Sequence, residues 1–293
     1  DLMAVKNIAV PGAIVQIAVA TLLGMLLSWF MGWTPIAGFI FGLALSVAST
    51  VVLLRALQVR NLVETERGQI AIGWLIVEDI VMVLALVMLP PLARIATNPD
   101  GADFMMVAQP MAATLFKVTG FVVFMLLIGR RIIPRVLHWV VHTGSRELFR
   151  LAVLAIALGV AFGAAFVFEV SFALGAFFAG MILGETALSR RAAEETLPLR
   201  DAFAVLFFVS VGMLFNPNVL VEQPLPLFAT VAIIIVGTSL AAFAIARLFR
   251  KSTKTSLTIA LSLAQIGEFS FILASLGTSL GVLPDEARDL ILA

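Results

Sequence analysis

Long, unbroken runs of apolar residues dominate this sequence of 293 residues. A helix that crosses the hydrocarbon core of a bilayer needs about 20 apolar residues, and only helices and closed barrels satisfy their backbone groups there. The runs are continuous rather than alternating, which favours helices over barrel strands. Hydrophobic residues make up 61% and charged residues 13% of the chain, against about 45–50% and about 25% in soluble domains. The sequence therefore predicts an all-α polytopic membrane protein.

Nine apolar segments of this kind can be placed along the chain. Basic residues test the count, because cytoplasmic loops are enriched in Lys and Arg. With a cytoplasmic N-terminus, the inner loops hold 16 of the 19 Lys and Arg residues, and only Arg94, Lys117 and Arg288 fall outside. Adding or removing one segment would destroy this asymmetry. The predicted segments are 8–30, 35–54, 69–93, 112–133, 148–168, 171–187, 201–216, 225–248 and 255–281.

Three acidic residues, Glu78, Asp79 and Glu268, lie in the middle of apolar segments. At ~1.5 Å per residue, Glu78 and Asp79 lie about 15 Å from the cytoplasmic end of their helix, near the bilayer midplane. Each central charge costs roughly 2.5–3.5 kcal/mol, so three would cost on the order of 8–10 kcal/mol. No Lys or Arg is expected at this depth. The carboxylates must therefore be protonated, hydrated or paired with a bound cation.

These three states make an exchange site. Burial favours the neutral form of an acid, whereas a bound cation favours the ionised form. One site can then hold a proton or a metal ion, but not readily both, and Glu78 and Asp79 should titrate as a coupled pair. The alternative is a structural acid that stays protonated and hydrogen-bonded, an alternative most open for Glu268.

Polar and small residues also interrupt two apolar segments. Ser46, Ser49 and Thr50 lie within 35–54, and Gln265 precedes Gly267 within 255–281. Discontinuous helices that cross at the midplane are a transporter device, so we expect both segments to be broken there. Hydroxyl groups that bond to their own helix, and small residues that pack helices, are the alternative explanation.

Other function classes find little support in the composition. The absence of cysteine excludes disulfides, thiol catalysis and Cys-ligated metals. A histidine-based metal centre is not expected, because His138 and His142 are the only histidines and lie in a basic loop. The net charge of +1 implies no nucleic-acid surface. We therefore expect a protein that is not an enzyme, with no cofactor in these residues and no nucleic acid as a partner.

Three stretches, Trp74–Asp79, Leu174–Leu183 and Leu206–Met213, together carry a family resemblance. Over essentially the whole chain, the sequence resembles the Kef-type branch of the monovalent cation:proton antiporters, and within it the YbaL-like proteins. The resemblance implies a sodium/proton-antiporter-like fold with inverted repeats and two crossed discontinuous helices, incomplete at both ends. It also implies a homodimer and a cytosolic nucleotide-binding domain that follows in the full-length protein.

The resemblance also assigns roles to residues. The transport aspartate of the family falls on Asp79, and the residue before it is Glu78. In related antiporters a lysine in the segment 225–248 pairs with that preceding carboxylate, but Thr238 occupies the lysine position here. A glutamate without a fixed ammonium partner is itself a candidate proton carrier. Ser46, Ser49, Thr50, Thr238, Gln265 and Glu268 are the predicted supporting residues, and Asp79 is the predicted ligand of a transient monovalent cation.

The resemblance divides the chain into four stretches. Residues 1–93 and 217–293 are the two parts of the transport core, 94–147 is a linker helix with a cytoplasmic loop, and 148–216 holds the helices of the dimerisation side.

The expected function is a secondary antiporter in the bacterial inner membrane. It exchanges potassium or sodium for protons by alternating access at the midplane carboxylates. A gated potassium efflux channel without obligatory proton exchange is the main alternative, and a sensor or scaffold without transport is another. An intramembrane aspartyl protease needs two facing aspartates, and Asp79 has no aspartate partner at its depth.

Overall fold

A computed structural model of the chain describes residues 2–97, 104–170 and 172–293. All regular elements in these residues are helices, which confirms the all-α prediction. Five of the described helices are long and apolar enough to cross a membrane, or six if the bent pair Ser189–Leu199 and Ala202–Met213 is one span. The five are Val5–Phe30, Glu66–Arg94, Ala112–Val141, Arg146–Val167 and Pro224–Leu248.

Three of the nine predicted segments do not form helices of full spanning length, and a fourth, 201–216, does so only if the bent pair is one span. The segment 171–187 becomes the short helix α8, Phe172–Glu185. The segment 35–54 divides into α2, Pro35–Ala44, and α3, Thr50–Val59. The segment 255–281 divides into α13, Thr253–Ser262, and α14, Glu268–Ser279. Both divisions occur where the polar and small residues of the sequence predict an interruption.

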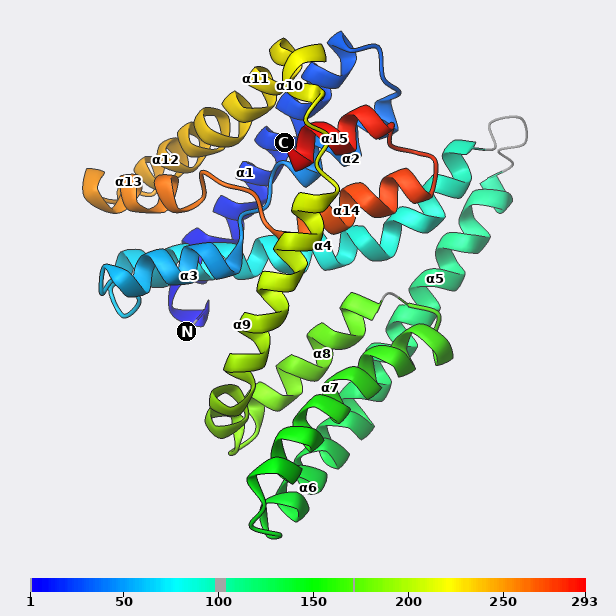
Figure 1. The fold of residues 1–293 in the computed structure, drawn as a ribbon, viewed down its shortest axis with the longest axis vertical. Coiled ribbons are helices and arrows are strands. Elements are labelled where there is room, and N and C mark those ends of the chain that lie inside the picture. The colour runs from blue at the N-terminus through cyan, green and yellow to red at the C-terminus, as the bar shows by residue number, and fades with distance from the viewer. Residues whose placement is uncertain (1, 98–103, 171) are drawn as a thin grey trace. The chain divides into compact units, whose positions relative to one another are not determined.

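The chain divides into two compact units, one of residues 1–85 with 211–293 and one of residues 86–210. The first unit begins with α1, Leu2–Phe30, and contains α2, α3 and most of α4, Glu66–Thr97. Its C-terminal helices return to α1, so that distant parts of the sequence share one unit (Figure 1). These helices are α10 (Val219–Glu222), α11 (Pro224–Ala232), α12 (Thr238–Leu248), α13, α14 and α15 (Asp285–Leu292), with a π-helical turn, Ile233–Gly237, joining α11 to α12.

Local signals set where the broken helices begin. Thr34 caps α2 by accepting a hydrogen bond from the Ala37 N–H at 3.3 Å, and Pro35 fills the first helical position. Ser49 caps α3 in the same way, through the Val52 N–H at 3.4 Å. Ser252 caps α13 through the Thr255 N–H at 3.1 Å. Each of these three half-helices therefore starts at its own capping residue.

Small residues allow α1 and α2 to pack in direct contact. A Cβ added to Gly24 would lie 2.3 Å from the Gly42 Cα atom, so neither position has room for a side chain. Glycines at such positions are how membrane helices approach each other closely. The first half of the broken helix is thereby fixed on α1.

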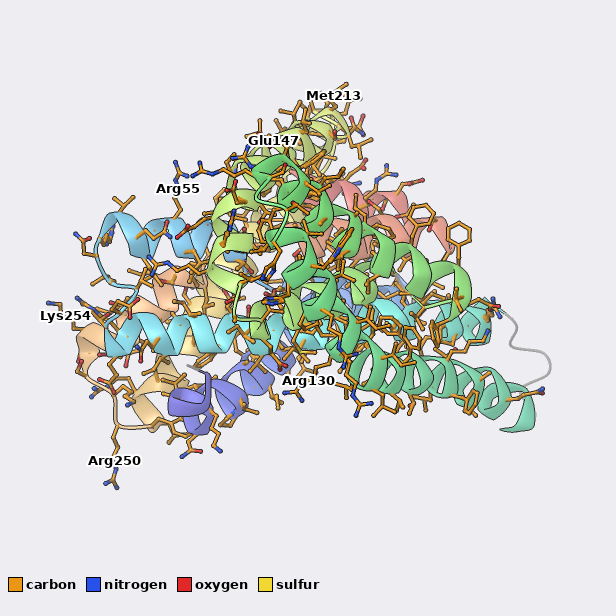
Figure 2. All side chains as sticks on the ribbon, turned by 90° about the horizontal axis from the view of Figure 1, so that it is seen from below. Arg55, Arg130, Glu147, Met213, Arg250 and Lys254 are labelled. Carbon is orange, nitrogen blue, oxygen red and sulfur yellow. The ribbon has the colours of Figure 1, made fainter. Side chains whose placement is uncertain are left out.

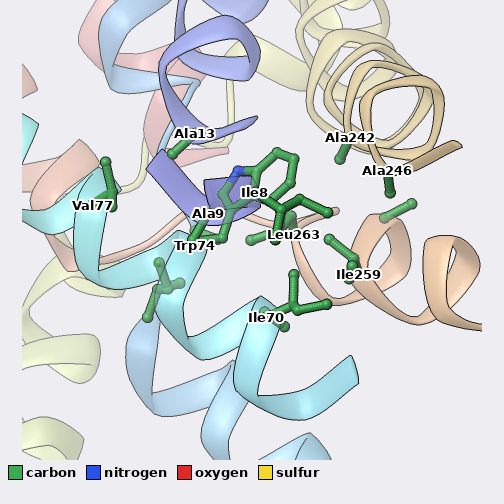
Figure 3. Close-up of a cluster of buried hydrophobic side chains, with 14 of the residues drawn as sticks. Ile8, Ala9, Ala13, Ile70, Trp74, Val77, Ala242, Ala246, Ile259 and Leu263 are labelled. Atoms are coloured by element: carbon green, nitrogen blue, oxygen red, sulfur yellow. The ribbon is translucent and has the colours of Figure 1, made fainter. Parts of the chain in front are cut away.

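A buried apolar cluster joins α1, α3, α4, α12 and α13 (Figure 3). Trp74 is its largest side chain, fully buried, and its ring occupies the space where Gly12 has no side chain. Trp74 and Glu78 are four residues apart and thus on one face of α4. The packing of the tryptophan therefore sets the orientation of the acidic part of α4.

The second unit consists of the end of α4, then α5 (Phe104–Phe124), a π-helical turn (Met125–Gly129), α6 (Arg130–Val141), α7 (Arg146–Val167), α8 and most of α9 (Ser189–Met213). Helices α7 and α8 are in direct contact, because a Cβ on Gly175 would lie 2.7 Å from the Ala161 Cα atom. Phe121 is buried against the rings of Phe168 and Phe178. The dimerisation role expected for 148–216 stays a prediction.

Candidate functional site

The two interruptions of the first unit, Leu45–Ser49 and Leu263–Gly267, cross each other. The Gly267 N–H donates to the Val47 carbonyl at 3.0 Å. The Gln265 amide bonds to Ser49 twice, accepting from its N–H at 3.2 Å and donating to its carbonyl at 3.2 Å. These contacts satisfy backbone groups that the broken helices leave free, as a membrane interior requires. The predicted crossed pair of discontinuous helices is therefore present.

Helix starts and acidic side chains meet at this crossing. Glu78 accepts from the Ala48 N–H at 3.1 Å. The Thr50 hydroxyl donates to Asp79 Oδ2 at 3.0 Å, and the Ser49 hydroxyl donates to Glu268 Oε2 at 3.2 Å. Helices α3 and α14 both begin here, and the N-terminal end of a helix favours negative charge. The site thus offers two positive helix ends to three carboxyl groups.

Each carboxyl group of the adjacent pair has one oxygen in a hydrogen bond and one without. Glu78 Oε1 and Asp79 Oδ1 are buried and have no hydrogen-bond partner among the described residues. Glu78 is fully buried, whereas Asp79 is half-buried. No ion pair with a Lys or Arg is found for these groups in the described part of the chain. A buried carboxylate oxygen without a partner is suited to hold a proton or a cation.

Two predicted supporting residues direct their hydroxyl groups elsewhere. The Ser46 hydroxyl donates to the Leu43 carbonyl at 2.7 Å, and the Thr238 hydroxyl donates to the Ile234 carbonyl. Both are local hydrogen bonds to the preceding turn, and for Ser46 this is the alternative that the sequence left open. A part for either side chain in ion binding stays a prediction, whereas Ser49, Thr50, Gln265 and Glu268 all lie at the crossing.

Gln16 on α1 is a contributor that the motifs did not indicate. Its side chain is buried, its Nε2 donates to the Ser46 carbonyl at 3.0 Å, and its Oε1 has no hydrogen-bond partner among the described residues. Ser46 lies in the interruption between α2 and α3, so Gln16 satisfies a carbonyl that the break exposes. The signal in the sequence is a single amide in the middle of an apolar helix.

Crossed broken helices with carboxyl groups at the crossing, in an all-helical membrane protein, define the class of secondary transporters. The comparison with protein families agrees, because residues 1–293 match the family described as "Sodium/hydrogen exchanger, transmembrane". The chain belongs to this family.

Comparisons with individual relatives place the chain more narrowly within this family. The chain is 63% identical over 293 residues to the protein named "Putative cation/proton antiporter YbaL" of Escherichia coli K12, covering 100% of the chain and 52% of the relative. It is 31% identical to "K(+) efflux antiporter 4" of Arabidopsis thaliana, covering 99% and 48%. It is 29% identical over 277 residues to "Putative K(+) efflux antiporter KefB" of Alkalimonas amylolytica, covering 94% and 41%. The Kef-type, YbaL-like resemblance is confirmed, and the chain spans about half the length of these relatives.

Proposed function

We propose that this chain is the transport region of a secondary antiporter that exchanges a monovalent cation, potassium or sodium, for protons. Membership of the sodium/hydrogen exchanger family supports the proposal. Relatives named as cation/proton and K(+) efflux antiporters support it further. The site is proposed to alternate between the two sides of the membrane around the carboxyl groups at the crossing.

One observation carries the proposal, the environment of Asp79. One carboxylate oxygen accepts from Thr50, the other is buried without a hydrogen-bond partner among the described residues, and the side chain is only half-buried. Asp79 is therefore the group proposed to take a cation or a proton on its second oxygen. Glu78 is fully buried and tied to the Ala48 N–H, so its proposed role is to hold the crossing and carry a second proton.

The crossing itself is proposed to move as one piece during transport. Gln265 and Gly267 bond to the backbone of the opposite interruption, so α2, α3, α13 and α14 share their central contacts. A monovalent cation that replaces a proton leaves the net charge of the site unchanged, because a carboxylate with its bound cation is as neutral as the carboxylic acid, so the exchange does not require these helices to separate. The acidic part of α4 is bonded to the same piece, through Glu78 and the Ala48 N–H and through Asp79 and the Thr50 hydroxyl. The proposed change of access therefore moves the crossing together with this part of α4, so that the ligands of the cation stay together.

The rest of the proposed assignment follows from charge distribution and resemblance. The protein is proposed to lie in the bacterial inner membrane with the N-terminus of this chain in the cytoplasm, because that orientation places most basic residues inside. It is proposed to form a homodimer and to carry a cytosolic nucleotide-binding domain outside these residues.

The test is cation and proton flux with the full-length protein reconstituted into liposomes. The wild type should couple potassium or sodium movement to an opposing proton movement, and Asp79→Asn should abolish both. Glu286→Gln, a change of an exposed carboxylate at the start of α15, is the matched control and should transport normally. Cation flux that persists unchanged without any counter-movement of protons would identify the channel alternative and refute antiport.

A further inference from the structure

A second polar feature of the first unit lies away from the carboxyl groups. A cavity of about 520 Å³ opens between α3, the start of α4 and α13. Three of its lining residues are cationic, and the other lining residues are apolar or hydroxyl-bearing. The cations are Arg60, directly after α3, Arg67 in the first turn of α4, and Lys254 in the first turn of α13.

None of these three cations has an ion-pair partner within the described ranges 2–97, 104–170 and 172–293. The residues that line the cavity include no Asp or Glu. A neighbouring cation behaves differently, since Lys251 forms an ion pair with Glu66 at 2.6 Å. Three positive charges around one cavity repel each other, and an anion bound between them would offset this repulsion.

The walls of the cavity add an apolar component. Leu257 and Leu261 of α13 line it and are exposed over 47% and 68% of their surface. All three cations are at helix ends, where a membrane protein meets the headgroup layer. Lys254 extends away from the ribbon, as does Arg55, which does not line the cavity (Figure 2). Cationic side chains beside exposed leucines are typical of a site that binds the charged headgroup of a lipid together with its apolar chains.

We propose that this cavity binds a phosphate-bearing anion, and that in the membrane the anion is the headgroup of a phospholipid whose chains lie against Leu257 and Leu261. Arg60 and Arg67 would bind phosphate oxygens through their planar guanidinium groups, and Lys254 would add a third charge. A bound phosphate links α3 to α13, the two half-helices that lead to the crossing. Binding of this anion does not depend on the transport activity.

The test uses the full-length protein in detergent and measures the shift of its apparent melting temperature in titrations with three probes. Phosphatidylglycerol and phosphatidylcholine compare an anionic with a zwitterionic lipid, and inorganic phosphate represents a soluble anion. The variants are Lys254→Gln, the triple change Arg60→Gln/Arg67→Gln/Lys254→Gln, and Arg55→Gln as the control. Each cation removed from the cavity should weaken binding of the anionic probe about fivefold, whereas Arg55→Gln should not change it.

Stabilisation by phosphatidylglycerol alone, weakened in Lys254→Gln and the triple variant, supports the lipid headgroup. Equal stabilisation by inorganic phosphate, weakened in the same variants, supports the phosphate site with a soluble source. An effect of phosphatidylglycerol that survives in Lys254→Gln and in the triple variant would overturn the proposal, as would equal effects of both lipids. Lys254 is exposed, so the single variant tests the proposal even if the triple variant does not fold.

Discussion

Gly267 is the position where one added methyl group should disable the crossing. A Cβ there would lie 2.8 Å from the Ser49 Cα atom, 2.9 Å from the Ser49 nitrogen and 3.0 Å from the Ala48 carbonyl carbon. Carbon atoms in contact prefer about 3.5–4.0 Å, so the two interruptions would have to separate by roughly 0.7–1.2 Å. All three obstacles are backbone atoms, which cannot rotate away as a side chain can.

The expected cost of Gly267→Ala follows from that displacement. Overpacking of this kind costs about 1–3 kcal/mol, and the hydrogen bond from Gly267 to Val47, now 3.0 Å, would lengthen past its useful range. A displacement of about 1 Å in a site that positions reacting groups costs on the order of a hundredfold in rate. We expect a comparable fall in exchange, together with a lower melting temperature.

The assay pairs flux in liposomes with thermal unfolding in detergent. Gly212→Ala is the control, because a Cβ at Gly212 meets nothing within 4 Å and the residue is helical. That change should leave exchange at the wild-type rate, with stability at the wild-type value or slightly above it. Wild-type exchange and stability in Gly267→Ala would refute the close backbone contact at the crossing.

Three further changes test other contacts. Thr50→Val removes the hydroxyl that donates to Asp79. The cation affinity should fall roughly tenfold or more, because a hydrogen bond to a charged group contributes about 1.5–3 kcal/mol. Exchange rates measured over a range of cation concentrations give this affinity. Trp74→Ala empties the centre of the buried cluster and should cost about 3–5 kcal/mol; an unchanged melting temperature would contradict that packing. Gln16→Leu leaves the buried Ser46 carbonyl without its donor. It should slow exchange and lower stability by about 1–3 kcal/mol, which flux and melting experiments on one preparation can check.

The sequence predicted the elements that rest on local signals. Long apolar runs predict long helices, and the polar and small residues around Ser49 and Gly267 predict interruptions, because such residues act on their own neighbours in the chain. Carboxyl groups in apolar segments identified Glu78 and Asp79 as unusual without any structure, because a charge deep in the bilayer is costly whatever the fold around it.

The features that escaped prediction depend on contacts between distant residues. Gln16 bonds to Ser46 across 30 positions, and Gln265 bonds to Ser49 across 216. No local pattern specifies such a partner. From the sequence alone, the Thr238 hydroxyl could bond either to its own helix or to the carboxyl groups of the site. In the structure it donates to the Ile234 carbonyl of the preceding turn.

The most direct test of the proposed mechanism asks whether one site holds either a proton or a cation. Calorimetric titration of the full-length protein with potassium or sodium, repeated in buffers of different ionisation enthalpy, counts the protons released for each cation bound. The mechanism predicts proton release with the wild type and loss of both binding and release in Asp79→Asn. Cation binding that releases no protons, or that persists in Asp79→Asn with the same affinity, would contradict it.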